Sequence, residues 1–300
     1  MGRYAEPLIN TPPLPPIENG VEVLIAESRL VHRANDDLDD VEEEQLMTVL
    51  VSFDPQPAQR SAARALAATF IAARSTFERL PAGRELVDWL NELLNTRVSA
   101  TLCIVLSLPH VYSEDTAQQI EGVLAGIRNR QHHHLQLAVA VSLKPADWGD
   151  SCGIDGFVSE DARGRDRASL LVFNMLAALM APGLSTCIDD EDFRMAFGTH
   201  EFPSRVASGV WLEAQATFVW ATAEDRKLVK NSKTIASMPS RCLQLSSQHR
   251  LMKEICKSTA NDFEFVMIAP YGMSSERLLA DQIVLVFLLA APNANERLLV

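Results

Sequence analysis

The chain has 300 residues, of which 47% are hydrophobic, and this is enough for a real core in one large domain or two of ordinary size. Its 27 basic and 39 acidic residues give a formal net charge of −12, which disfavours unspecific binding to nucleic acid or to an anionic membrane surface. The five cysteines form no CxxC pair, which indicates reduced thiols and a cytoplasmic protein. The longest apolar runs are shorter than the roughly 20 residues of a spanning helix, so we expect no membrane insertion.

The first 20 residues are predicted to form an extended, proline-rich leader. Residues 6–19 (EPLINTPPLPPIEN) contain five prolines, which exclude a helix or a central strand. An arm lying on the surface is one interpretation, and a ligand for a module that reads polyproline is the other. Residues 21–26 (VEVLIA) then indicate a first strand. The acidic run 36–44 is interpreted as a solvated loop and helix start, because carboxylates suit the positive end of a helix.

The next 90 residues alternate between predicted strands and helices. We expect a strand at 46–53, a long alanine-rich helix at 58–77, a second helix at 83–94, a strand at 101–108, a helix at 113–130 and a strand at 135–143. This alternation predicts a mostly parallel sheet with helices on both faces. The three histidines at 132–134 lie in a turn, where successive side chains rarely converge on one ion, so we predict no metal site.

Residues 165–181 are predicted to form the central helix of the molecule. The stretch 168–181 is apolar nearly all round, with Asn174 as its one interruption, and Pro182-Gly183 ends it. A helix of this kind must pack against other elements on several faces. It belongs to a predicted first domain, residues 21–198.

Residues 199–300 are predicted to form a smaller C-terminal α/β domain with its own sheet. The pattern indicates a strand or a helix at 211–222, a polar and basic stretch at 224–235, a short strand at 242–246, an amphipathic helix at 248–257, and strands at 263–269 and 283–290.

Taken together, these features resemble the FtsZ/tubulin superfamily. The strand AVAVSLKP, within residues 135–197, resembles the family's VAVVTKP, and the following APGLSTCIDDEDFR resembles its RPGLINVDFADVR. Residues 263–290 resemble the family's final pair of strands. The resemblance covers about half of the chain. It implies a nucleotide-binding-like α/β domain, a central buried helix and a smaller α/β domain.

The glycine-rich phosphate loop of that family is replaced in this chain. The resemblance places the family's GGGTGTG after the strand at 101–108, where glycine lets backbone N–H groups approach phosphate oxygens closely. Here the segment is PHVYSEDT, which lacks glycine, removes one N–H at Pro109 and adds the carboxylates of Glu114 and Asp115. These departures imply that GTP binding has been lost and that no cofactor is held.

Arginines occupy the position of another nucleotide contact. The resemblance places the family's guanine-reading asparagine at Arg165, which makes Arg165 the weak candidate for any cofactor contact. A rebuilt anion pocket that uses Arg163, Arg165 and Arg167 is one interpretation, and simple solvent contact at a helix start is the favoured one.

The acidic turn after the central helix is retained. In the family, carboxylates of this loop enter the nucleotide pocket of the neighbouring subunit and position the attacking water. The resemblance implies these roles in trans for Asp189 and Asp192, and an interface of Asp189, Asp190, Asp192 and Arg194. The same residues also suit an N-cap and the first turn of a helix, and both interpretations can hold.

Three hypotheses about function follow. The first is a non-catalytic, cytoplasmic assembly protein, a pseudo-GTPase that associates with itself or with a partner GTPase filament of the cytoskeleton. The second is a divergent GTP-binding hydrolase of the family. The third is a scaffold or adaptor that docks its partners through the leader. No GxSxG or HExxH motif favours any other hydrolase chemistry.

Overall fold

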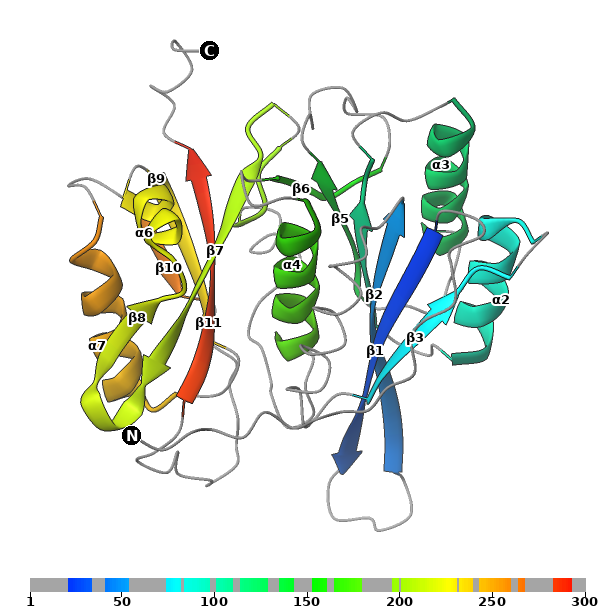
Figure 1. The fold of residues 1–300 in the computed structure, drawn as a ribbon. Helices are drawn as coiled ribbons and strands as arrows, with labels where there is room; N and C mark the ends of the chain where they lie inside the picture. The colour runs from blue at the N-terminus through cyan, green and yellow to red at the C-terminus, as the bar shows by residue number, and fades with distance from the viewer. Residues whose placement is uncertain are drawn as a thin grey trace, which may run out of the picture.

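The computed structural model describes most of the two halves of the chain. The described residues are 21–33, 41–53, 74–81, 84–97, 101–109, 114–128, 135–142, 153–160, 165–179, 196–199, 201–230, 232–239, 243–259, 264–267 and 283–292. They form an α/β protein in which helices cover both faces of a sheet (Figure 1).

Eleven of the described segments are strands of one sheet. They are β1 (Val21–Arg33), β2 (Val41–Phe53), β3 (Arg74–Arg79), β4 (Thr101–Ser107), β5 (Leu135–Ser142), β6 (Gly156–Ser159), β7 (Ser204–Leu212), β8 (Thr217–Trp220), β9 (Ser232–Pro239), β10 (Glu264–Met267) and β11 (Ile283–Pro292). Their order across the sheet is β10-β9-β11-β7-β6-β5-β4-β2-β1-β3, and β8 pairs with β7. The described helices are α2 (Leu86–Arg97), α3 (Glu114–Arg128), α4 (Arg165–Leu179), α6 (Ala223–Lys230) and α7 (Leu245–Cys256).

The centre of the sheet is parallel, as predicted. Strands β2, β4, β5, β6 and β7 pair in parallel, whereas β1 and β3 on one side and β11 and β8 on the other add antiparallel pairs. The middle strand β4 is buried on both faces, which is why Cys103 to Leu106 form an unbroken apolar run.

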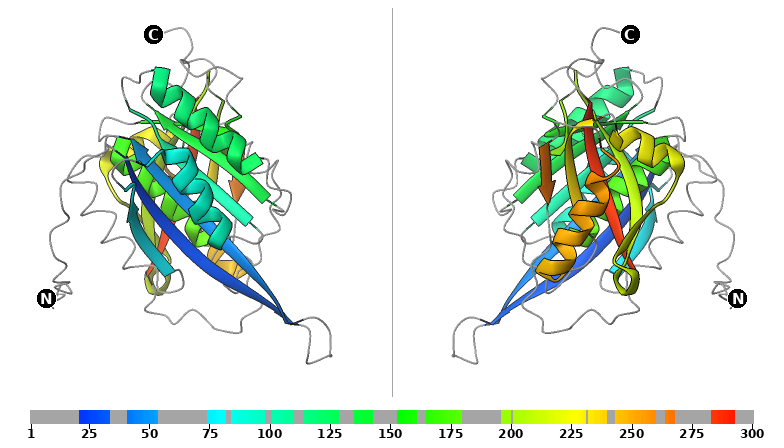
Figure 2. Two further views of the ribbon diagram at one scale, coloured as in Figure 1. Left: turned by 90° about the vertical axis from the view of Figure 1, so that its right-hand side faces the viewer. Right: turned by 90° about the vertical axis from the view of Figure 1, so that its left-hand side faces the viewer.

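Each face of the parallel strands has its own core. Alternate residues point to opposite faces, so Val49 and Val51 of β2 pack with Leu90 of α2 and Leu124 of α3, whereas Leu50 packs with α4. Figure 2 shows α2 and α3 together on one side of the sheet.

Helix α4 is the predicted central helix, and it is buried on nearly all sides. Its core side chains Phe173, Met175 and Leu176 share one cluster with β2, β4 and β5. The same cluster includes Val206 of β7 and Phe287 of β11, so α4 packs against both halves of the chain.

The C-terminal half does not have a sheet of its own, contrary to the prediction. Strand β7 pairs with β6 at Val158↔Ser204 and Ser159↔Arg205, so β7, β11, β9 and β10 continue the first sheet. The physical reason is the open edge of β6, whose N–H and C=O groups need a further strand. Helices α6 and α7 cover this part of the sheet on a third core that includes Trp211, Val229 and Leu251. Where the domains divide, at residues 198–199, stays a prediction.

Two predicted helical segments contain strands instead. The end of the segment 58–77 is wrong, because residues 74–79 form β3 and pair with β1; residues 58–73 lie outside the described residues. Pairing with β1 outweighs the helix propensity of the alanines before it. The helix start in the acidic run 36–44 is also wrong for residues 41–44, which open β2.

Three further differences lie in the C-terminal half. The segment 211–222 is a hairpin of β7 and β8 around a 3-10 turn, closed by Ala216 with a left-handed φ of 47°. The stretch 224–235, which had no predicted element, contains α6 and the start of β9. A strand at 242–246 is wrong, because Leu245 is the first residue of α7. The amphipathic helix at 248–257 is confirmed with an earlier start, since burial of Leu251 and Ile255 fixes its inner face.

Among the described helices, none combines the length with the apolar character that crossing a membrane requires.

Asn174 provides a test of how α4 is packed. Its Nδ2 donates a hydrogen bond to the carbonyl oxygen of Leu170 at 2.6 Å, but its buried Oδ1 has no hydrogen-bond partner among the described residues. Leucine has the same branched shape, so Asn174→Leu removes an unsatisfied acceptor. We expect the free energy of unfolding to rise by about 1 kcal/mol, measured by urea denaturation.

Leu176→Ala serves as the control for this measurement. It truncates a buried apolar side chain on the same helix and should lower the free energy of unfolding by roughly 2–5 kcal/mol. If Asn174→Leu also lowers it, then Oδ1 has a partner such as a buried water molecule.

Candidate functional site

The topology of the sheet singles out one edge as the place for a site. After β2 the chain runs to β3, on the far side of β1, and then returns through α2 to β4, which lies beside β2. From β4 onward the strands are added in the opposite direction. The carboxyl ends of β2 and β4 are therefore a switch point, where open α/β sheets bind their ligands.

A row of polar residues crosses this switch point. Glu22 of β1 is the register neighbour of Ser52 of β2, which is in turn the neighbour of Ser107 of β4. All three are buried, and the Glu22 side chain is only 3% exposed. Residues that are two positions apart in a strand point to the same face of the sheet. Two positions from these polar residues are Leu24, Leu50 and Val105, which belong to the hydrophobic core that contains α4. The row therefore lies on the face that α4 covers.

Helix α4 directs one more buried hydroxyl toward the same face of the sheet. Ser169 is fully buried and shares a helical stripe with Val172, Phe173 and Leu176, on the side of α4 opposite Arg167. This stripe is directed to the parallel strands, because α4 contacts β2 and β4 while Arg167 reaches the C-terminal half. In the described part of the chain, the hydroxyls of Ser107 and Ser169 have no hydrogen-bond partner.

The connection from β4 to α3 borders the same edge. Leu108 still donates its N–H to the carbonyl oxygen of Val141 at 3.0 Å, so the strand is held up to that residue. Pro109 follows and has no N–H to offer. Helix α3 then begins at Glu114, with Asp115 next. The buried Glu22 places a carboxylate at the same edge, where a bound phosphate would meet a like charge.

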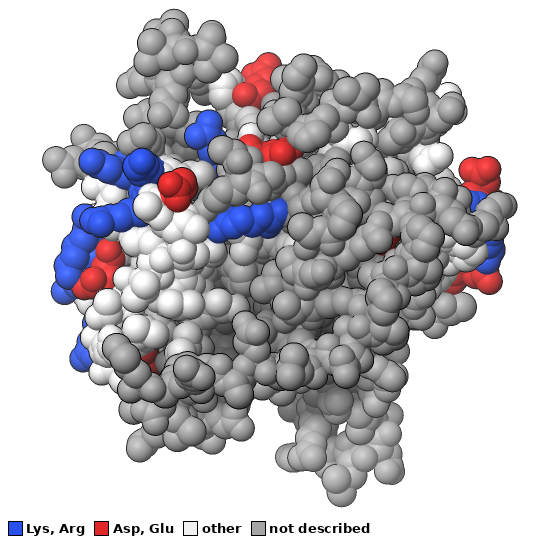
Figure 3. Space-filling model, in the orientation of Figure 1, with Lys and Arg blue, Asp and Glu red and all other residues white. Residues whose placement is uncertain are grey.

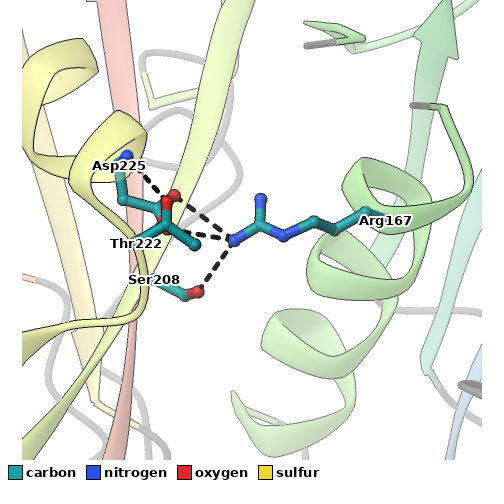
Figure 4. A network of polar contacts seen from close by, with 4 residues as sticks. All are labelled: Arg167, Ser208, Thr222 and Asp225. Atoms are coloured by element: carbon teal, nitrogen blue, oxygen red, sulfur yellow. Dashed lines mark hydrogen bonds and ion pairs between the residues drawn. The ribbon is translucent and has the colours of Figure 1, made fainter. Parts of the chain in front are cut away.

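Arg167 joins the start of α4 to the C-terminal half. Its Nη2 donates to Oδ2 of Asp225 at 3.1 Å and to Oδ1 at 3.3 Å, and it also donates to Oγ of Ser208 on β7 at 3.3 Å (Figure 4). Asp225 is fully buried, with 0% of its side chain exposed, whereas 26% of the Arg167 side chain is exposed. The solvent-contact interpretation of Arg167 is therefore wrong, because its guanidinium balances a buried carboxylate.

The cap of α6 fixes the position of Asp225. Its backbone N–H donates to Oγ1 of Thr222 at 3.1 Å, and the Thr222 hydroxyl donates to Oδ2 of Asp225 at 2.8 Å. Thr222 is thus the N-cap of α6, and Asp225 sits in the positively polarised first turn. The Thr222 hydroxyl and the Arg167 guanidinium therefore both donate to this carboxylate, as burial of a charge demands.

Most of the predicted site residues lie outside the described part of the chain. Asp189, Asp190, Asp192 and Arg194 are in this group, as are Arg163 and the histidines 132–134. Arg165 is the first residue of α4, and its side chain is not described. The proposed roles of these residues stay predictions.

Two groups of the site were missed by the sequence interpretation. The pair of Thr222 and Asp225 carries a readable signal, since threonine followed three residues later by a carboxylate is a helix-start pattern. Its partner Arg167 lies 58 residues earlier in the chain, and no sequence pattern indicates that the two residues form a pair. Glu22 is visible only as one charge within an apolar strand, and the row that it forms depends on strand order.

The ion pair between Arg167 and Asp225 gives a prediction for stability. Arg167→Met removes the cation and leaves the buried carboxylate without charge compensation. Such losses cost roughly 3–5 kcal/mol in fully buried pairs, and because Arg167 is partly exposed we expect a fall of about 3 kcal/mol in the free energy of unfolding.

Arg84→Met is the matched control for that variant. Arg84 pairs with Glu92 across an exposed surface, with 44% and 62% of the two side chains exposed, so its loss should cost at most about 1 kcal/mol. Equal effects of the two substitutions in urea denaturation would contradict a special role of the Arg167–Asp225 pair.

Comparison with known proteins finds similarity to solved structures. No family model matches the sequence, and no curated protein matches it. Among solved structures, the chain is similar to a point mutant of FtsZ from M. jannaschii, with 12% sequence identity and a TM-score of 0.40. The similarity covers 70% of this chain and 70% of that chain.

Proposed function

We propose that this chain is a non-catalytic assembly protein of the FtsZ/tubulin type, which associates with itself or with a partner GTPase filament and does not bind GTP. The observation that carries the proposal is the composition of the switch point. In the sequence, Pro109, Glu114 and Asp115 take the place of the glycines that offer backbone donors to phosphate in the family that this chain resembles, and the buried Glu22 places a carboxylate at the same edge of the sheet.

The packing around α4 supports an assembly role. The helix joins the parallel strands to the C-terminal half through one apolar core and through the Arg167–Asp225 pair. A subunit held together in this way suits a protein that acts through its outer surfaces. In this proposal the interface includes Asp189, Asp190, Asp192 and Arg194, and the carboxylates of Asp189 and Asp192 act only on the nucleotide of a partner.

A titration with nucleotides tests the missing pocket. Purified protein is titrated with fluorescent GTP and ATP analogues, and its sedimentation is followed at several protein concentrations. We expect no binding up to about millimolar ligand, which is a binding free energy weaker than roughly −4 kcal/mol, together with association that grows with protein concentration.

Micromolar nucleotide binding would contradict the proposal and favour the divergent hydrolase. In that case Arg165→Ala should weaken the binding, because Arg165 stands at the position that the family uses to read the base.

The acidic turn is tested by comparing two altered proteins. Asp189→Ala/Asp192→Ala should weaken self-association in sedimentation experiments, because it removes charged groups from the proposed interface. Deletion of residues 1–20 should leave association unchanged. The opposite result, in which only the deletion abolishes association, would favour an adaptor that docks through its leader.

A further inference from the structure

Two helices of the C-terminal half form an outer side of the molecule. Helices α6 and α7 share one core with β7 and β11, in which Val229 and Leu251 are buried. Helix α4 packs on the opposite face of the same two strands. In the right-hand view of Figure 2, α6 and α7 lie towards the viewer. The residues of these helices that point away from the core are therefore directed outward.

The outer sides of both helices carry positive charge. On α6, the buried residues Asp225 and Val229 mark the inner side, and on α7 the buried residues Leu251 and Ile255 do so. Figure 3 shows lysine and arginine side chains gathered at the left of the molecule, where Figure 1 places the two helices. The exposed basic residues, which we call the basic face, are Arg226, Lys227 and Lys230 on α6 and Arg250, Lys253 and Lys257 on α7.

Few carboxylates of the two helices compensate this charge. Asp225 is buried against Arg167 and does not reach the outer side. Glu254 pairs with Lys257, and Glu224 is exposed at the start of α6. The exposed cations therefore outnumber the carboxylates beside them, and the basic face attracts anionic groups although the whole chain has a net charge of −12.

Helix α7 also presents an apolar stripe beside its basic residues. Leu245 begins the helix and is 82% exposed, more than any other large hydrophobic side chain in the described residues. Helical spacing places Met252 and Cys256 on the same side of the helix, and both are half-buried. Burial raises the pKa of the Cys256 thiol, which keeps this side chain uncharged. The neighbouring stripe consists of Arg250, Lys253 and Lys257.

A basic stripe beside an apolar one is the pattern of helices that lie on membranes. A bilayer with anionic lipids offers negative headgroups to the cations and an apolar layer beneath them to the leucine. Duplex nucleic acid offers phosphates but no apolar layer that Leu245 could enter. A protein partner would need a pocket shaped for this projecting side chain, whereas a fluid bilayer needs none. The combination of charges and exposed leucine therefore favours a lipid surface.

The acidic character of the rest of the chain does not oppose this contact. At physiological ionic strength, charges more than about 8 Å apart are largely screened in water, so the lipids respond to the nearest side chains. The exposed carboxylates of Glu85, Asp88 and Glu121 lie around α2 and α3, at the other end of the sheet in Figure 1. The uneven charge thus turns the basic face toward an anionic membrane and the α2 end away from it.

We infer that α6 and α7 form a peripheral membrane-binding face. The six cations contact anionic lipid headgroups, and Leu245 enters the outer part of the apolar layer. This contact goes beyond the proposed self-association and does not depend on it, because a single copy carries the complete face. In an assembly, each further copy adds a contact with the same membrane, so the attachment strengthens with the number of copies.

Binding to vesicles tests the inference. The full-length protein is sedimented with vesicles of phosphatidylcholine alone and with vesicles in which about one third of the lipid is phosphatidylserine. We expect binding to the anionic vesicles only, because the basic face needs negative headgroups. The binding should weaken as salt is added, because salt screens the attraction.

A matched pair of charge variants tests the position of the contact. Lys227→Gln/Lys253→Gln removes one cation from each helix of the basic face. Arg84→Glu changes the net charge by the same amount at an exposed residue next to α2. We expect the first variant to bind anionic vesicles at least about tenfold more weakly and the second to bind like the unaltered protein.

Two substitutions of Leu245 test the insertion of this residue. Leu245→Ser removes the apolar anchor at an exposed position and should weaken vesicle binding about fivefold or more. Leu245→Trp places a fluorophore there, and its emission should move to shorter wavelength when anionic vesicles are added. The matched control is Ala125→Trp at an exposed position of α3, whose emission should not move.

Each contrary result has a distinct meaning. If the unaltered protein does not bind anionic vesicles, the membrane contact is overturned, and an acidic protein surface becomes the partner that fits the basic face. If the two charge variants bind equally well, attraction follows the total charge, and the role of α6 and α7 is overturned. If Leu245→Ser has no effect and the emission of Leu245→Trp does not move, the insertion is overturned. None of these results decides self-association, which is measured without vesicles.

Discussion

The burial of α4 between two halves of one sheet is the constraint on which the rest of the structure depends. A helix that is apolar on nearly every side must be covered on every side, and strands β2, β4 and β5 cover only one of them. The C-terminal strands β7 and β11 supply the remaining cover, which brings them against the helix and into line with β6. The continuous sheet thus follows from the need to bury one helix.

The ion pair between Arg167 and Asp225 fixes the geometry that apolar contacts leave open. Hydrophobic burial has no preferred direction, so a leucine-rich helix can rotate or slide at little cost. A guanidinium that must reach a fully buried carboxylate allows far less freedom, because any slip leaves the charge uncompensated. The carboxylate is itself held by the cap of α6, so the pair aligns α4 with β7 and α6 together. The pair thereby contributes more to the specific arrangement of the halves than to the net free energy of folding.

Sequence patterns predicted the helices and strands that are determined by residues close to one another in the sequence. Strands β2, β4 and β5, the central helix and the amphipathic helix α7 follow from periodicity and composition, whereas no strand was predicted at 156–159 or at 204–210, where β6 and most of β7 lie. Features that depend on residues far apart in the sequence were not predicted. Residues 74–79 form a strand because β1 lies beside them. Strand β7 continues the first sheet because the edge of β6 needs a neighbouring strand. The same division applies to the site. The lack of glycine in the segment after β4 is visible in the sequence, but the row of Glu22, Ser52 and Ser107 can be recognised only once the strand order is known.

Charge is distributed unevenly between the switch point and the outer helices of the C-terminal half. A carboxylate at the edge of the sheet repels a phosphate group bound beside it, and this chain buries Glu22 at that edge. Helices α6 and α7, far from the switch point in the sequence, carry exposed basic residues such as Arg226, Lys227 and Arg250. Residues 1–198 contain 16 basic and 29 acidic residues, whereas residues 199–300 contain 11 basic and 10 acidic residues, so the net charge of −12 arises almost entirely in the N-terminal half.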